Sequence, residues 1–167
     1  MSRMVDRRLI GYGAALAVFA LDRITKRLVE TRLSFDDTVR VIPGFFDIVH
    51  SQNRGVAFGI FNDSAFQWRT ALLVTAALAA VVVVSWMLRN AARMDRCTFW
   101  GLALVLGGAL GNVYDRIVSG QVTDFLLFYL GDYQWPAFNV ADSAIVVGSG
   151  LLLLELVRPK RQVANAS

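Results

Sequence analysis

The sequence predicts an all-α membrane protein with four transmembrane helices, a small extracytoplasmic β-sheet and a short surface helix. The chain is 56% hydrophobic and only 18% charged, and its mean hydropathy is +0.50. Its apolar residues gather in four runs, each close to the roughly 20 residues that a helix needs to cross a bilayer. The 167 residues show no internal repeat, no low-complexity stretch and no sign of a second domain. We therefore expect a single integral membrane domain over 1–167.

The four predicted spans are residues 9–28, 70–88, 99–116 and 140–157. The first is interrupted by Asp22 and Lys26, which lie four residues apart and can pair on one helix face. An alternative interpretation takes its basic start, short apolar core and small residues near Ala20 as a cleaved signal peptide. The helical pattern continues past that point, which favours a span.

The two long connections, 29–69 and 117–139, are predicted to be extracytoplasmic. Residues 39–60 mix β-branched and aromatic residues with two turn sequences, Pro-Gly and Asn-Arg-Gly, which predicts short strands in a sheet on the membrane surface. Residues 117–139 are rich in Phe, Tyr and Trp, which suits the membrane interface. Within them, the stretch TDFLLFYL (123–130) is predicted as a short helix lying in the surface plane.

The distribution of Lys and Arg predicts the orientation. If both termini are cytoplasmic, the inner segments carry nine basic and three acidic residues, and the rest of the chain carries eight basic and ten acidic ones. This asymmetry, clearest in the 89–97 loop and the two tails, agrees with the positive-inside rule. The ends of the first and third spans and the start of the fourth then all lie at the outer surface.

Polar residues gather at that depth on three of the four spans. Ionisable residues inside a span indicate function by default, because they are costly there. Along the third span, five residues share one helix face: Gly108, Gly111, Asn112, Asp115 and Arg116. The spacing of Gly107 and Gly111 lets another helix come close. Asp115 and Arg116 alone would also be explained as the place where the helix leaves the membrane, but Asn112 lies a turn deeper.

Two aspartates near the outer surface suggest acid–base chemistry. Asn139 can cap the fourth span and puts Asp142 at its third position, so capping alone would explain Asp142. Asp124 alone would be explained as a solvated loop acid. The predicted topology brings both to one surface, and two close carboxyl groups can share a proton, activate water and protonate a leaving amine.

Other chemistries find little support in the composition. Cys97 and His50 are the single cysteine and histidine, and no metal-ligand motif is present. The net charge of +4 is scattered along the chain, which does not suggest a nucleic-acid partner. We therefore expect no metal, no cofactor and no nucleic acid, and an inert Cys97.

Five motifs in register resemble the lipoprotein signal peptidases, the type II signal peptidases of bacteria. They are DRITK (22–26), QNRGVAFG (52–59), GGALGNVYDR (107–116), VTDF (122–125) and FNVADS (138–143). The resemblance covers nearly the whole chain. It implies an aspartic endopeptidase of the bacterial inner membrane, which cuts a prolipoprotein signal peptide just before the diacylglyceryl-modified cysteine.

The resemblance also implies roles for particular residues. Asp124 and Asp142 match the catalytic pair, residues 39–60 match a cradle for substrate, and 125–133 match an outer helix over the site. We also expect the aromatic segment 125–138 to close over the substrate and exclude water. Arg23 and Arg54 depart from the expected pattern. The positions that would bind substrate or support the pair are Asp22, Lys26, Asn53, Gly55, Gly108, Asn112, Asp115, Arg116 and Asn139. The implied partners are the prolipoprotein and membrane lipid, and a monomer would suffice.

Three alternatives remain open at the level of sequence. Ser143 and Lys26 could form a Ser/Lys protease. The carboxylates could instead serve a proton-coupled transporter, although transporters often show internal repeats. The polar layer could also only specify helix pairing in an assembly subunit.

Overall fold

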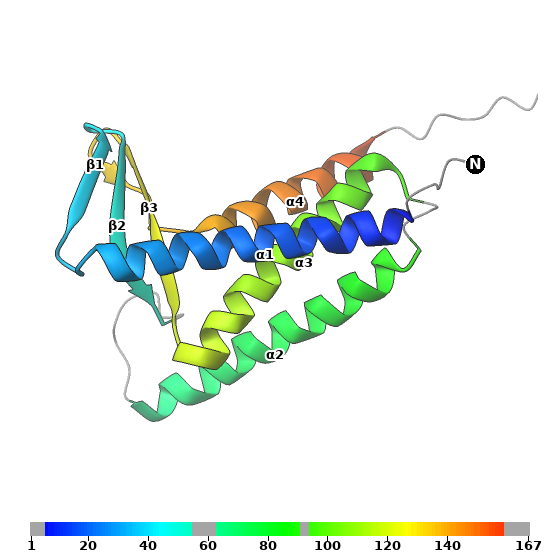
Figure 1. The fold of residues 1–167 in the computed structure, drawn as a ribbon, viewed down its shortest axis with the longest axis horizontal. Coiled ribbons are helices and arrows are strands. Elements are labelled where there is room, and N and C mark those ends of the chain that lie inside the picture. The colour runs from blue at the N-terminus through cyan, green and yellow to red at the C-terminus, as the bar shows by residue number, and fades with distance from the viewer. Residues whose placement is uncertain (1–5, 55–62, 91–93, 159–167) are drawn as a thin grey trace, which may run out of the picture.

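The computed structural model describes residues 6–54, 63–90 and 94–158. The described chain is mostly helical with one small antiparallel sheet. Its helices are α1 (Arg7–Arg32), α2 (Asp63–Leu88), α3 (Arg96–Ser119) and α4 (Val140–Val157). Its strands are β1 (Thr38–Ile42), β2 (Phe46–Asn53), β3 (Val122–Leu130) and β4 (Tyr133–Gln134). Figure 1 shows the four helices as an elongated bundle with the sheet at one end.

Helix α3 is the centre of the bundle and packs against the other three helices. Its apolar face, including Phe99 and Leu102, forms the core together with Ala15 of α1 and Leu88 of α2. The outward faces of the helices carry exposed apolar side chains, an arrangement that suits a lipid environment.

Three helices in the described residues are long and apolar enough to cross a membrane: Ala71–Leu88, Arg96–Ser119 and Val140–Val157. Helix α1 is not among them, since its sequence carries Asp22, Arg23, Lys26 and Arg27 within six residues. Four transmembrane helices therefore stay a prediction for this chain.

The helix directions bring the polar ends together. Helices α1 and α3 run toward the sheet, whereas α4 starts beside the sheet and runs away from it (Figure 1). The C-terminal ends of α1 and α3 and the N-terminal end of α4 thus lie at the same end of the bundle. The polar residues on those three ends come together there.

Glycines allow the close approach that this convergence needs. A β-carbon at Gly108 would collide with the backbone oxygen of Ala141, and one at Gly111 would collide with the Asp22 carboxylate. Gly107 faces the backbone of Ala15 in the same way. The close helix approach predicted from the Gly107/Gly111 spacing is confirmed.

The predicted small sheet is confirmed as an antiparallel sheet with strand order β1-β2-β3-β4, and its place on the outer side stays a prediction. In the pairing of β2 with β3, Ser51 lies opposite Asp124 and Asn53 lies opposite Val122. The register shifts between Ile48 and Ser51, which marks a β-bulge in β2 next to Asp124. Residues 55–62, including Gly55, lie outside the described residues.

The prediction of a surface helix over 125–133 is wrong. Most of this stretch belongs to β3, whose backbone pairs with β2 on one side and with β4 on the other. The ring of Phe128 stacks on Phe46 at 4.6 Å and on Phe138 at 5.7 Å. A segment of aromatic and apolar residues can form either structure, and the long-range partner β2 decided it.

Candidate active site

The two predicted aspartates meet through one buried side chain, that of Asn139. Asp124 extends from β3 and is 2% exposed, Asn139 is fully buried just before α4, and Asp142 is half-buried in the first turn of α4. The Asn139 amide nitrogen donates to Asp124 Oδ1 at 2.7 Å, and its amide oxygen accepts from the Asp142 backbone N–H at 2.9 Å. Asn139 thereby fixes the positions of both aspartates.

The start of α4 is a capping box, as the sequence predicts. The backbone N–H of Asn139 donates in return to Asp142 Oδ2 at 3.3 Å. This reciprocal pair locks the rotamer of Asp142 and puts its carboxylate at the positive end of the helix dipole. The capping role does not compete with chemistry, because Asp142 Oδ1 remains directed toward α3.

Helix α3 supplies the second amide of the site. Asn112 Nδ2 donates to Asp142 Oδ1 at 2.7 Å. Asn112 Oδ1 also accepts from Asn139 Nδ2 at 3.4 Å. Asp124 therefore receives a side-chain amide N–H from Asn139, and Asp142 receives one from Asn112.

A buried charge cluster lies behind these amides. Lys26 Nζ lies 2.8 Å from Asp22 Oδ2 and 2.6 Å from Asp115 Oδ2, and all three side chains are buried. Arg23 pairs with the other oxygen of Asp115 and stacks over the Tyr114 ring at 4.7 Å. Two acids and two bases balance one another, which is the condition for keeping charges buried.

Burial raises the pKa of Asp124 from 3.8 to about 6. Hydrogen bonds from Asn53 and Asn139 favour the ionised form and oppose this rise, while the nearby charge of Asp142 adds to it. A carboxyl group of this kind exchanges its proton near neutral pH, which is the range a general acid needs.

Two of the predicted supporting residues, Arg116 and Gly108, have contacts elsewhere in the structure. Arg116 turns back to donate to the Asn112 backbone oxygen at 3.1 Å. Gly108 is a packing position against Ala141, and Gly55 lies outside the described residues. Arg54, which departs from the family pattern, donates to Gln121 Oε1 at 3.2 Å.

Two contacts were missed by the sequence reasoning. Thr123, beside Asp124, donates its hydroxyl to Glu30 Oε1 at 2.8 Å and so ties β3 to α1. The backbone N–H of Ala141 donates to Asp22 Oδ1 at 2.9 Å and ties α4 to α1. The motifs VTDF and NVAD contain both residues, but nothing local identifies their partners.

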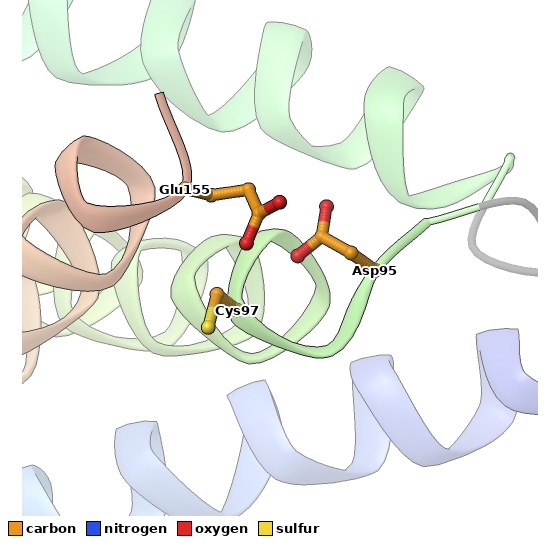
Figure 2. A group of neighbouring side chains, drawn as sticks. All are labelled: Asp95, Cys97 and Glu155. Atoms are coloured by element: carbon orange, nitrogen blue, oxygen red, sulfur yellow. The ribbon is translucent and has the colours of Figure 1, made fainter. Parts of the chain in front are cut away.

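One group of three potential metal ligands occurs in the described residues, at the opposite end of the bundle. Figure 2 shows the carboxylates of Asp95 and Glu155 close together with Cys97 beside them, and the ligand atoms of the three residues lie within 4.8 Å of one another. Asp95 caps α3 by accepting from the Thr98 N–H and hydroxyl at 2.7 and 2.6 Å. Glu155 lies 3.6 Å from Arg158. Both carboxylates thus have protein partners, and the group is remote from the aspartate pair.

Comparison with known proteins gives the same architecture. A solved bacterial membrane enzyme, determined by the in meso method at 2.3 Å resolution, superposes with a TM-score of 0.78 at 26% identity, covering 92% of this chain and 94% of that one. A second such structure, at 1.9 Å resolution, gives the same TM-score at 27% identity, covering 89% and 93%. The fold and its apolar helices define a membrane-embedded enzyme.

Sequence relatives identify the family. The family model of signal peptidase (SPase) II matches residues 14–158. A lipoprotein signal peptidase of Solibacter usitatus is 65% identical over 164 residues, covering 98% of this chain and all of that protein. One from Sulfurihydrogenibium is 39% identical, covering 92% and 94%. The chain belongs to the signal peptidase II family.

Proposed function

We propose that this chain is an aspartic endopeptidase in which Asp124 and Asp142 cleave the signal peptide of prolipoproteins. Its membership of the signal peptidase II family supports the reaction. One observation carries the catalytic type: Asn139 holds the two aspartates, with its amide nitrogen on Asp124 and its amide oxygen on the Asp142 backbone. The arrangement supplies two carboxyl groups at one place, each with its own amide donor.

The different surroundings of the two aspartates suggest different roles. Asp142 is half-buried in the first turn of α4 and accepts from Asn112, a position that suits the general base. Asp124 is almost fully buried and its pKa is raised to about 6, so it carries the shared proton as general acid.

In the proposed reaction the two aspartates act only by transferring protons, and water is the nucleophile. Asp142 takes a proton from water as the water oxygen attacks the scissile carbonyl carbon, and Asp124 donates its proton to the carbonyl oxygen. The C–N bond breaks when the carboxyl of Asp142 returns its proton to the amine, while Asp124 regains a proton from the hydroxyl of the intermediate. Peptide plus water yields acid plus amine, and both aspartates recover their starting states.

The membrane arrangement belongs to this proposal. The outward face of α1 is apolar, with Leu16, Ile24 and Leu28 all more than half exposed, while Asp22 and Lys26 are buried against α3 and α4. These features support α1 as a fourth span. With both termini cytoplasmic, the site lies at the outer surface of the bacterial inner membrane, where a diacylglyceryl-modified cysteine would present the cleavage point.

The Ser/Lys alternative has less support. The Ser143 hydroxyl donates to the Asn139 backbone oxygen at 2.9 Å, within its own helix. The Lys26 ammonium is already surrounded by Asp22, Asp115 and Asn112. Neither group is placed to act on the other as nucleophile and base.

Prolipoprotein processing by variants tests the proposal. We expect Asp124→Asn and Asp142→Asn each to abolish signal-peptide removal from a lipid-modified prolipoprotein, because each loses one proton-transfer group. Ser143→Ala is the matched control on the same helix turn and should process substrate at nearly the normal rate. Normal processing by either Asn variant, with inactive Ser143→Ala, would support the serine alternative instead.

A further inference from the structure

Lys26 is a buried lysine that the proposed reaction does not use directly. Its side chain is 0% exposed. Its ammonium lies 2.8 Å from Asp22 Oδ2, 2.6 Å from Asp115 Oδ2 and 3.2 Å from Asn112 Oδ1. Two of these contacts are hydrogen bonds, to Asp22 Oδ2 and Asn112 Oδ1, and the contact with Asp115 is an ion pair. The ammonium is thus held by three protein side chains.

The third of these contacts determines how the Asn112 amide is oriented. An amide has an oxygen that only accepts and a nitrogen that only donates. Because Asn112 Oδ1 faces the ammonium of Lys26, its Nδ2 faces Asp142 Oδ1, at 2.7 Å. The reverse orientation would put an amide oxygen against a carboxylate and an N–H against a cation. The lysine charge thus excludes the wrong orientation.

We infer that Lys26 is a positioning residue, which orients and polarises the Asn112 amide so that Asp142 is held as the ionised partner of the pair. A cation at the amide oxygen strengthens the N–H as a donor, since hydrogen bonds in a chain polarise one another. A stronger donor at Asp142 favours its carboxylate over its acid form. This inference rests on the proposed role of Asp142 as general base.

Charge balance is the competing explanation for a buried lysine. Lys26 and Arg23 together neutralise Asp22 and Asp115, so loss of Lys26 leaves one buried negative charge in excess. A test must separate that general effect from the specific effect on Asn112. Restoring charge balance elsewhere does not restore the cation at the Asn112 amide oxygen, where only the longer contact from Asn139 Nδ2, at 3.4 Å, would remain among the hydrogen bonds described here.

The test compares Lys26→Met with Arg27→Met in kinetics on a lipid-modified prolipoprotein. For Lys26→Met we expect kcat to fall on the order of 100-fold with little change in KM. We also expect the acid limb of the kcat–pH profile to move to higher pH, since Asp142 would protonate more easily. Arg27 loses the same charge from the next position of α1, but its side chain is 73% exposed. Arg27→Met should therefore keep the wild-type profile.

A double variant keeps the inference testable if Lys26→Met does not fold. Lys26→Met with Asp22→Asn restores the charge balance and leaves the Arg23–Asp115 pair in place. We expect it to fold and still show the lower kcat and the shifted acid limb. A wild-type pH profile in the folded variant, or an equal loss of rate at every pH, would overturn the inference. Activity in Asp142→Asn would instead overturn the proposed function.

Discussion

At the scale of residues, two asparagines organise the site. Asn139 and Asn112 each direct an amide N–H at one aspartate, and among the described residues no ion pair to either carboxylate is found. The charged cluster around Lys26 lies behind Asn112, which contacts both Lys26 and Asp142. This separation lets Asp124 keep a raised pKa while the surrounding polar groups remain paired.

The raised pKa of Asp124 has a consequence for stability. A group whose pKa is about 6 in the folded state and 3.8 as an isolated group contributes stability below pH about 4, and this is lost as pH rises through about 6. At pH about 8 the buried charge costs at most about 3 kcal/mol. We expect Asp124→Asn, which cannot ionise, to melt at a higher temperature than the wild type at pH about 8.

Thermal unfolding in detergent at two pH values checks this prediction. At pH about 4 the melting temperatures of the wild type and Asp124→Asn should converge, because Asp124 is then protonated. Asp132→Asn changes an exposed acid in the turn between β3 and β4 and should follow the wild type at both pH values. If Asp124→Asn has the melting temperature of the wild type at both pH values, burial does not oppose the ionisation of Asp124, and the prediction is wrong.

At the scale of elements, the site depends on how closely α3 approaches α1 and α4. Gly108 and Gly111 bring the backbone of α3 against Ala141 and against the Asp22 carboxylate. The same approach lets the Ala141 N–H reach Asp22 Oδ1. The same helix contacts therefore determine both the packing of the bundle and the geometry of the site. A substitution that separates these helices should lower both stability and activity.

Gly108→Ala tests that link. A β-carbon there would collide with the Ala141 backbone oxygen, so we expect a loss of about 1–3 kcal/mol in stability and a fall in cleavage rate as the start of α4 shifts. Gly150→Ala is the control, because no atom lies within 4 Å of the added carbon. Equal melting temperature and activity in the two variants would mean that α3 and α4 can separate without harm to the site.

The elements also show where sequence reasoning was sufficient. Asp22 and Lys26, four residues apart, pair as expected, and the capping box at Asn139 forms as expected, because both depend on local spacing alone. The strand β3 was predicted as a helix, since its aromatic run fits either structure until β2 is placed beside it. The Thr123–Glu30 contact was missed for the same reason: its partners are 93 residues apart.

At the scale of the whole molecule, the helix directions determine where the polar residues meet. The sequence predicted that the ends of three helices would share one level, and the sheet lies at that end of the bundle (Figure 1). Helix α1 is not among the three helices apolar enough to cross a membrane, although its Asp22 and Lys26 are buried. The orientation across the bilayer follows from the distribution of Lys and Arg, and it stays a prediction.

Cysteine labelling tests this orientation. Cys97→Ser should process substrate normally and provides a background without cysteine, because Cys97 is the single cysteine. In that background, Asp132→Cys should react with a membrane-impermeant maleimide added to spheroplasts whose inner membrane is intact. Asn90→Cys, exposed after α2, should react only once the membrane is opened. The opposite pattern would invert the predicted topology and put the aspartate pair on the cytoplasmic side.

The central claim is that Asp124 and Asp142 perform the cleavage together. Its most direct measurement is the single-turnover cleavage rate of a purified, lipid-modified prolipoprotein by the wild type and by each Asn variant, all reconstituted in lipid and shown to be folded. The account predicts that each single variant loses at least about 1,000-fold in rate, and that the double variant is no slower than either, since the two groups act as a unit. Retention of more than about a tenth of the wild-type rate by Asp124→Asn or Asp142→Asn would contradict it.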